Sequence, residues 1–155
     1  MVTPNFGHIA KLTPTAKAWY TIHEIEGTPK LEVCYAGRTN KPYFAALQKL
    51  AIARARGVKI QKGNDESLAR ANIEALERVM ANDRVLFPKY VILGWEGVVD
   101  SAGNPVEFNS VNCAEFVAAL PDWIFQRLQQ FCDHAANFVD EDAPTPEDIS
   151  EASKN

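Results

Sequence analysis

The sequence predicts a mostly helical α+β chain: an N-terminal β-hairpin, about four amphipathic helices, one further short strand and turn unit, and an acidic C-terminal tail. Two observations indicate this class. A stretch near the start is rich in β-branched and aromatic residues around a turn with Gly and Pro, and later stretches repeat apolar residues at helical spacing. The length of 155 residues suits one globular domain, expected at residues 1–138, with the acidic and flexible tail at 139–155.

The first third of the chain predicts an arm and then the hairpin. Residues 1–15 contain two prolines and no clear period, so we expect an irregular arm or a short edge strand. Strands are expected at 18–25 and 31–35, where β-branched and aromatic residues gather, and residues 26–29 supply the turn. These strands should pair as a two-stranded antiparallel unit.

Two helices are expected in the middle of the chain. The first, at 42–56, has Pro42 in its first turn and is stopped by Gly57. The second opens near residue 64 and ends at residues 82–83, and Pro88 separates it from the next segment, because the residue before a proline avoids the helical region. One apolar stripe marks its buried face: Leu68, Ala71, Ala75, Leu76, Val79 and Met80.

The stretch from Tyr90 to Asp100 begins as a nearly continuous apolar run. The spacing of its apolar residues does not distinguish helix from strand, so it is predicted to be a buried strand or a bent helix-to-strand run. Residues 101–104 form a turn, and residues 105–108 a short extended piece.

Two more helices complete the prediction. Asn109 is expected to cap the first, which runs to Leu120. Asp122 is expected to cap the second, which carries an apolar stripe as far as Phe138. Apolar residues become rare beyond that point.

Composition and charge exclude several classes. With 46% hydrophobic and 23% charged residues, the chain is not expected to be wholly disordered. No apolar run approaches the ~18–20 residues of a membrane span. The first residues lack a signal-peptide pattern, so we expect cytosolic folding with reduced cysteines in the core.

The charge is unevenly distributed. Residues 139–155 carry six acidic residues against one base, whereas the stretch from Arg38 to Lys62 carries seven bases and no acid. That basic stretch is either a solvated helix face or a site for an anionic partner, which includes the acidic tail of this or a neighbouring copy. The low pI of 5.4 argues against binding to duplex DNA.

No arrangement typical of catalysis or metal binding is recognisable in the sequence. Cys132 and His134 are the one close Cys/His pair, and their spacing points them to different helix faces. Motifs for an activated serine, a zinc protease or a phosphate-binding loop are missing. We therefore predict no enzyme, no metal and no cofactor. Trp19, Trp95 and Trp123 are expected in the core, with an interface as the alternative.

One segment resembles a known family. Residues 94–109 have the sequence GWEGVVDSAGNPVEFN, which is similar to the C-terminal region of tail assembly chaperones from long-tailed bacteriophages. The positions that carry this resemblance are Trp95, Gly97, Asp100, Gly103, Phe108 and Asn109. Asn109 stands where the family more often has Ser or Thr, and all three can cap a helix. The resemblance extends over residues 86–140.

The resemblance implies a non-enzymatic protein that acts in the host cytoplasm. Tail assembly chaperones coat the long, apolar, helical tape measure protein before the tail tube polymerises around it. The implied partners are therefore the tape measure protein and the tail tube protein. A structural component of the tail or virion, such as an adaptor, is the first alternative. A small inhibitor whose acidic end mimics nucleic acid is another, and a small hydrolase comes last.

Two helices are the expected contact faces for a helical partner. The helix at 42–56 combines apolar residues with a positive rim, and the helix at 122–138 carries more apolar bulk than one small core needs. The predicted partner-binding residues are Phe44, Leu47, Lys49, Arg54, Arg56, Trp123, Ile124 and Phe131.

Overall fold

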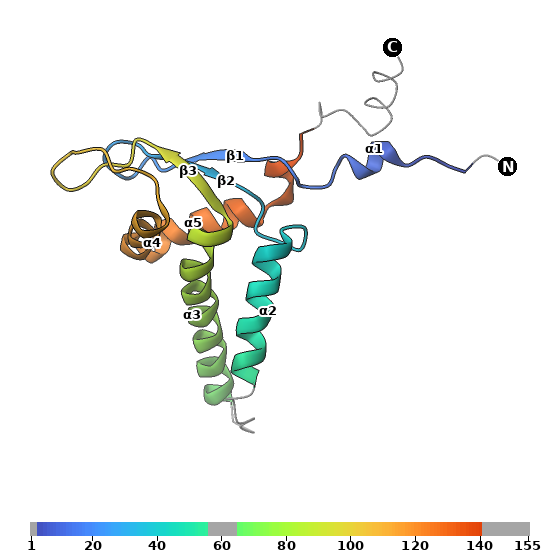
Figure 1. Ribbon diagram of the computed structural model, residues 1–155. Coiled ribbons are helices and arrows are strands. Elements are labelled where there is room, and N and C mark those ends of the chain that lie inside the picture. Colours follow the sequence, from blue (N-terminus) through green and yellow to red (C-terminus); the bar gives the residue numbers. More distant parts are fainter. Residues whose placement is uncertain (1–2, 56–64, 141–155) are drawn as a thin grey trace, which may run out of the picture.

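The computed structural model describes residues 3–55 and 65–140, and it confirms the predicted mixed, mostly helical class. A three-stranded antiparallel sheet lies over two helices, and two further helices project away from this body (Figure 1). In chain order the elements are α1 (Gly7–Ala10), β1 (Ala18–Thr21), β2 (Lys30–Val33), α2 (Lys41–Ala55), α3 (Asp65–Tyr90), β3 (Ile92–Glu96), α4 (Ser110–Ala119), α5 (Asp122–Asp133) and the 3-10 helix η1 (Ala135–Phe138). The predicted acidic tail lies outside the described residues from position 141 onward.

Over its described residues, 3–15, the N-terminal arm forms no edge strand and contains the single turn α1 instead. Phe6, Ile9 and Leu12 are each more than half exposed, and α1 buries no residue. The chain joins the body at Ala16, whose N–H donates a hydrogen bond to the Phe138 carbonyl at 2.8 Å. The arm therefore adds nothing to the core.

β1 and β2 form the predicted antiparallel hairpin, with Tyr20 opposite Leu31. Both strands are shorter than predicted, because β1 ends at Thr21 and β2 ends at Val33. Ile22 is fully buried, and its N–H donates to the Pro29 carbonyl at 2.8 Å. β3 pairs antiparallel with the other side of β2, which gives the strand order β1-β2-β3.

The prediction that a helix ends at residues 82–83 is wrong, because α3 continues to Tyr90 with Pro88 inside it. Proline in this last turn removes one N–H donor. The Val91 N–H nevertheless donates to the Phe87 carbonyl at 3.0 Å, and Phe87 is buried in the core. Packing of this turn outweighs the extended preference of the residue before proline. β3 begins two residues after α3 ends, so this stretch is the predicted helix-to-strand alternative, and only Ile92 of the strand is buried.

α5 differs from its prediction at both ends. Its cap residue is Pro121, which makes no side-chain cap bond, and Asp122 is the first helical residue instead of the cap. The helix ends at Asp133 because His134 takes an extended conformation, and the chain resumes as η1. This break turns Phe138 into the core, where it is fully buried.

The core lies between the sheet and the helices α3, α4 and α5. Two of the three cysteines expected in the core, Cys113 and Cys132, are fully buried in it, whereas Cys34 is only half-buried. Burial raises the pKa of the Cys113 and Cys132 thiols, that of Cys113 to about 12. The expectation for the tryptophans is wrong for two of them. Trp19 is 49% exposed and Trp123 is 52% exposed, whereas Trp95 packs against the core.

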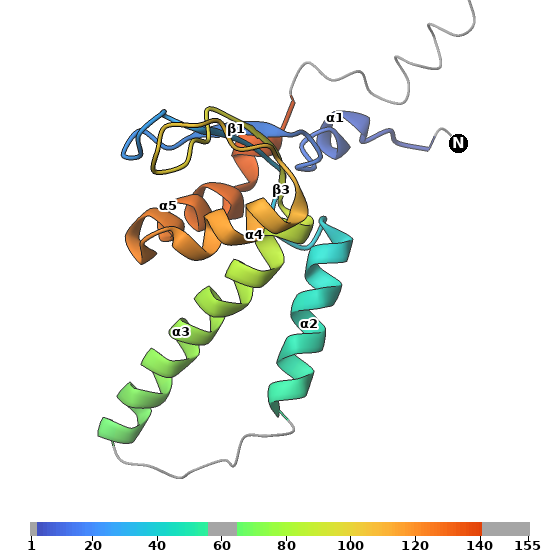
Figure 2. The same cartoon turned by 60° about the vertical axis from the view of Figure 1, so that its left-hand side comes forward.

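α2 and α3 extend from the body as two legs that separate toward their far ends (Figure 2). The apolar stripe predicted to be buried on α3 is exposed there, because α2 does not cover it: Leu68, Leu76 and Val79 are each more than half exposed. No helix within the described ranges is long and apolar enough to cross a membrane.

Candidate partner-binding site

A cavity of about 440 Å³ opens at the head of the two legs, where α2, α3 and α5 meet. Apolar side chains from α2 and α3 form part of its wall, and amide side chains from α5 form another part. The lining residues include Phe44, Leu47, Val79, Phe87, Gln126 and Gln130. The cavity is thus apolar on one side and hydrogen-bonding on the other.

A polar network joins the three helices at this cavity. Asp83 on α3 is only 6% exposed and accepts hydrogen bonds from the Tyr43 hydroxyl at 2.6 Å and from Gln129 Nε2 at 2.7 Å. Burial raises the pKa of Asp83, and the two hydrogen bonds oppose that rise. Burial and the hydrogen bond to Asp83 also raise the pKa of Tyr43. The two donors come from α2 and α5, so Asp83 holds both cavity walls against α3.

Two of the five residues predicted on the helix at 42–56 lie at the cavity. Phe44 and Leu47 both line it and are half-buried. The guanidinium carbon of Arg38 lies 5.9 Å from the centre of the Phe44 ring. Lys49 is exposed further along α2. Arg56 and the side chain of Arg54 lie outside the described residues.

The residues predicted on α5 do not form a contact face. Ile124 is 5% exposed and belongs to the core. Phe131 is half-buried and packs its ring against Tyr20 at 5.0 Å and against Phe138 at 5.7 Å between centroids, so it lies against the core. The sheet covers this side of α5, which accounts for the apolar bulk noted in the sequence. Trp123 alone stays exposed, and it does not line the cavity.

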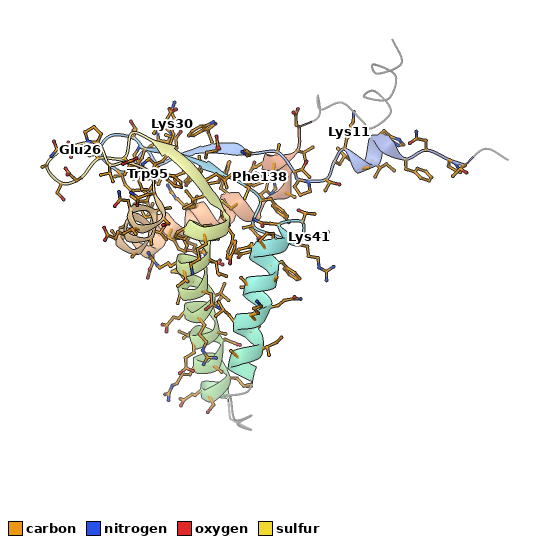
Figure 3. The ribbon with its side chains drawn as sticks, viewed as in Figure 1. Lys11, Glu26, Lys30, Lys41, Trp95 and Phe138 are labelled. Atoms are coloured by element: carbon orange, nitrogen blue, oxygen red, sulfur yellow. The ribbon has the colours of Figure 1, made fainter. Side chains whose placement is uncertain are left out.

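Trp95 joins β3 to the start and middle of α4. Its ring meets Phe108 edge-on at 5.0 Å and Phe116 at 5.4 Å between centroids. Its indole N–H donates to the Val106 carbonyl at 2.9 Å. Figure 3 shows Trp95 at the opposite end of the sheet from Phe138. The most recognisable residue of segment 94–109 is therefore structural.

The turn in segment 94–109 is built by one aspartate. The Asp100 carboxylate accepts hydrogen bonds from the N–H groups of Ala102 and Asn104, each at 2.9 Å. Gly103 has φ +85°, a backbone conformation that residues with a side chain rarely adopt. An Asx turn of this kind needs Asp or Asn at its first position and Gly near its end.

The ends of the same segment are also structural. Gly97 has φ +79°, and a Cβ added there would lie 2.9 Å from the carbonyl oxygen of Gly27 in the hairpin turn. Asn109 is the N-cap of α4, as predicted, and its side-chain oxygen accepts from the Asn112 N–H at 2.8 Å. The segment thus positions α4 and the hairpin, and it lies outside the cavity.

Sequence reasoning missed the polar network. Asp83 follows Met80 by three residues and precedes Phe87 by four, which puts it on the buried stripe of α3. The prediction that this helix ends at residues 82–83 concealed that spacing. Tyr43 and Gln129 gave no comparable signal, because a buried hydrogen-bond partner on another helix leaves no local pattern.

The side chains at the cavity offer apolar contact and hydrogen bonding. The glutamines of α5 can donate and accept, and the Asp83 carboxylate is occupied by its two donors. In the ranges that the structure describes, no group of three or more His, Cys, Asp or Glu residues is placed to hold a metal ion.

A family model described as YdaY prophage protein matches residues 39–147. The chain belongs to the YdaY prophage protein family. The matched range includes α2, α3 and α5, which form the cavity, and the whole of segment 94–109. Family membership shows the phage origin that the resemblance of this segment implied. No curated protein and no solved structure gives a match.

Proposed function

We propose that this YdaY family protein is a non-enzymatic tail assembly chaperone that binds the tape measure protein while the phage tail is built. The observation that carries the proposal is the cavity at the head of the legs, where Phe44 and Leu47 lie open beside amide side chains. The prophage family and the resemblance of residues 94–109 support the same assignment. The tail tube protein is the second partner, because it displaces the chaperone.

A helical partner suits the shape and chemistry of the cavity. An amphipathic helix docks by placing side chains three or four residues apart into an apolar groove. Phe44 and Leu47 are three apart on α2 and form one ridge of matching spacing, and Gln126 and Gln130 are four apart on α5. Apolar side chains of the partner would contact the first pair, and its polar side chains the second.

The size of the cavity favours reversible binding. About 440 Å³ accommodates a few side chains, so the contact area stays modest. Small interfaces are typical of transient complexes. Lys49 lies exposed further along α2, where a charge affects mainly the association rate and its salt dependence. A complex of this kind can dissociate when the tube protein arrives.

Co-expression with the tape measure protein of the same prophage tests the proposal. We expect affinity capture of the tape measure protein through a tag on this chain. Leu47→Gln should weaken capture because it replaces an apolar wall of the cavity. Leu93→Gln is the matched control, since Leu93 lies on β3 and does not line the cavity. Circular dichroism of both variants verifies that the fold is retained.

Purified virions separate the chaperone from its main alternative. A chaperone is displaced during assembly, so the protein should be missing from finished particles although it is present in the infected cell. Stable incorporation into virions would identify a structural tail component, such as an adaptor, in its place. Failure of capture with a correctly folded protein would contradict the proposal directly.

A further inference from the structure

The far half of α3 carries an apolar patch that the described chain leaves uncovered. Leu68, Ile73 and Leu76 are each more than half exposed on this part of α3; the patch consists of Ile73 and Leu76, which lie three residues apart on one face, and Leu76 reaches 72%. These residues lie beyond the cavity, toward the end of the leg where α2 and α3 separate (Figure 2). We call Ile73 and Leu76 the leg patch.

The leg patch continues the buried face of the same helix. Phe87, Asp83 and Met80 face the body at spacings of four and three residues, and Leu76 and Ile73 extend the series by four and three. This 3–4 repeat is the pattern by which helices pack in bundles. An exposed helix gains most of its stability from covering such a face. The leg therefore has the pattern of a bundle helix without enough neighbours.

The two legs have opposite charge. α2 contains three basic residues and no acid, whereas residues 65–80 of α3 contain four acids and two arginines. A foreign helix of either sign would complement one leg and repel the other. A two-fold axis parallel to the legs places the basic α2 of each copy beside the acidic α3 of the other copy. Both legs then face a helix of opposite charge. Charge thus favours a second copy as the occupant.

We infer that two copies of this chain associate through their leg patches and form a four-helix bundle from two α2–α3 pairs. Neighbouring helices are antiparallel in this arrangement, and like helices lie on the diagonals. The Tyr43–Asp83 hydrogen bond sets the register of the legs. Lys49 lies six residues after Tyr43 on α2, and Glu77 lies six residues before Asp83 on α3. The two residues therefore lie at the same height along the legs. Lys49 of one copy then pairs with Glu77 of the other.

Sedimentation velocity of the full chain over a range of micromolar concentrations tests the inference. We expect a monomer–dimer equilibrium. Leu76→Glu should weaken dimerisation roughly tenfold or more, because it buries a charge in the bundle. Leu76 is largely exposed in one copy, so the variant should keep the thermal stability of the monomer. Val111→Glu is the matched control, since Val111 is similarly solvent-exposed on α4 and far from the leg patch.

A charge exchange tests the arrangement of the helices. Lys49→Glu and Glu77→Lys should each weaken the dimer, and the double variant should restore it. No restoration would overturn the placement of α2 beside the partner's α3. A protein that stays monomeric at all concentrations, or that loses its dimer equally with Val111→Glu, would overturn the inference. If such a monomer still captures the tape measure protein, the proposed function stands without the dimer.

Discussion

Trp95→Ala is expected to lower the free energy of unfolding by about 3 kcal/mol, the lower end of the range for removal of a packed aromatic residue. The indole ring fills the space between β3 and α4, where it contacts Phe108 and Phe116. Its removal leaves a cavity and also frees the Val106 carbonyl of its hydrogen bond. Urea denaturation followed by circular dichroism measures the change.

Two variants make this result specific. Trp95→Phe keeps a ring but loses the indole N–H, so it should cost about 1 kcal/mol. Trp19→Ala removes an equally large side chain that is 49% exposed on β1, and it should cost clearly less than Trp95→Ala. Equal losses for the two alanine variants would contradict the structural role given to Trp95.

Arg84→Ala should cost about 1–3 kcal/mol, because it leaves the Leu120 carbonyl at the end of α4 without its donor and takes one of two donors from the Val117 carbonyl. Arg84 donates to the Val117 carbonyl at 2.6 Å and to the Leu120 carbonyl at 2.8 Å. It also pairs with Asp122 at 2.6 Å, and its guanidinium lies over the Phe125 ring at 4.8 Å. One side chain on α3 thus fastens the end of α4 and the start of α5.

Arg78→Ala is the matched control for this prediction. Arg78 lies six residues earlier on the same helix and pairs only with Glu74, at 3.4 Å, in the described chain. Exposed pairs four residues apart contribute below about 0.5 kcal/mol. The two variants remove the same charge, so equal stability losses would show that the contacts of Arg84 with α4 and α5 add little.

Local signals predicted the parts of the fold that depend on nearby residues. The hairpin followed from β-branched residues around a turn, and the cap of α4 followed from Asn109. The end of α3 could not be predicted this way. Pro88 argues for a break, and only the burial of Phe87 by distant elements keeps the turn helical. Tertiary packing decided against the local preference there.

The candidate site, too, was predicted only where nearby residues determine it. Helical spacing correctly placed Phe44 and Leu47 on one face of α2, and both line the cavity. The same reasoning assigned Ile124 and Phe131 to a partner, although Ile124 is buried in the core and Phe131 packs against it. An amphipathic stripe indicates which face of a helix is covered but not what covers it. The uncovered face of α3, by contrast, was expected in the core.

The measurement that tests the central claim most directly is the affinity of the purified protein for a helical tape measure segment, with the cavity open or filled. Gln126→Trp fills the cavity from an exposed position on α5. Ala118→Trp is the matched control, because it fills a separate hollow of about 570 Å³ between α3 and α4. Fluorescence anisotropy should show binding weakened roughly tenfold or more by Gln126→Trp and unchanged by Ala118→Trp. Equal affinities for both variants and the wild type, or no binding of the wild type at micromolar concentration, would contradict the account.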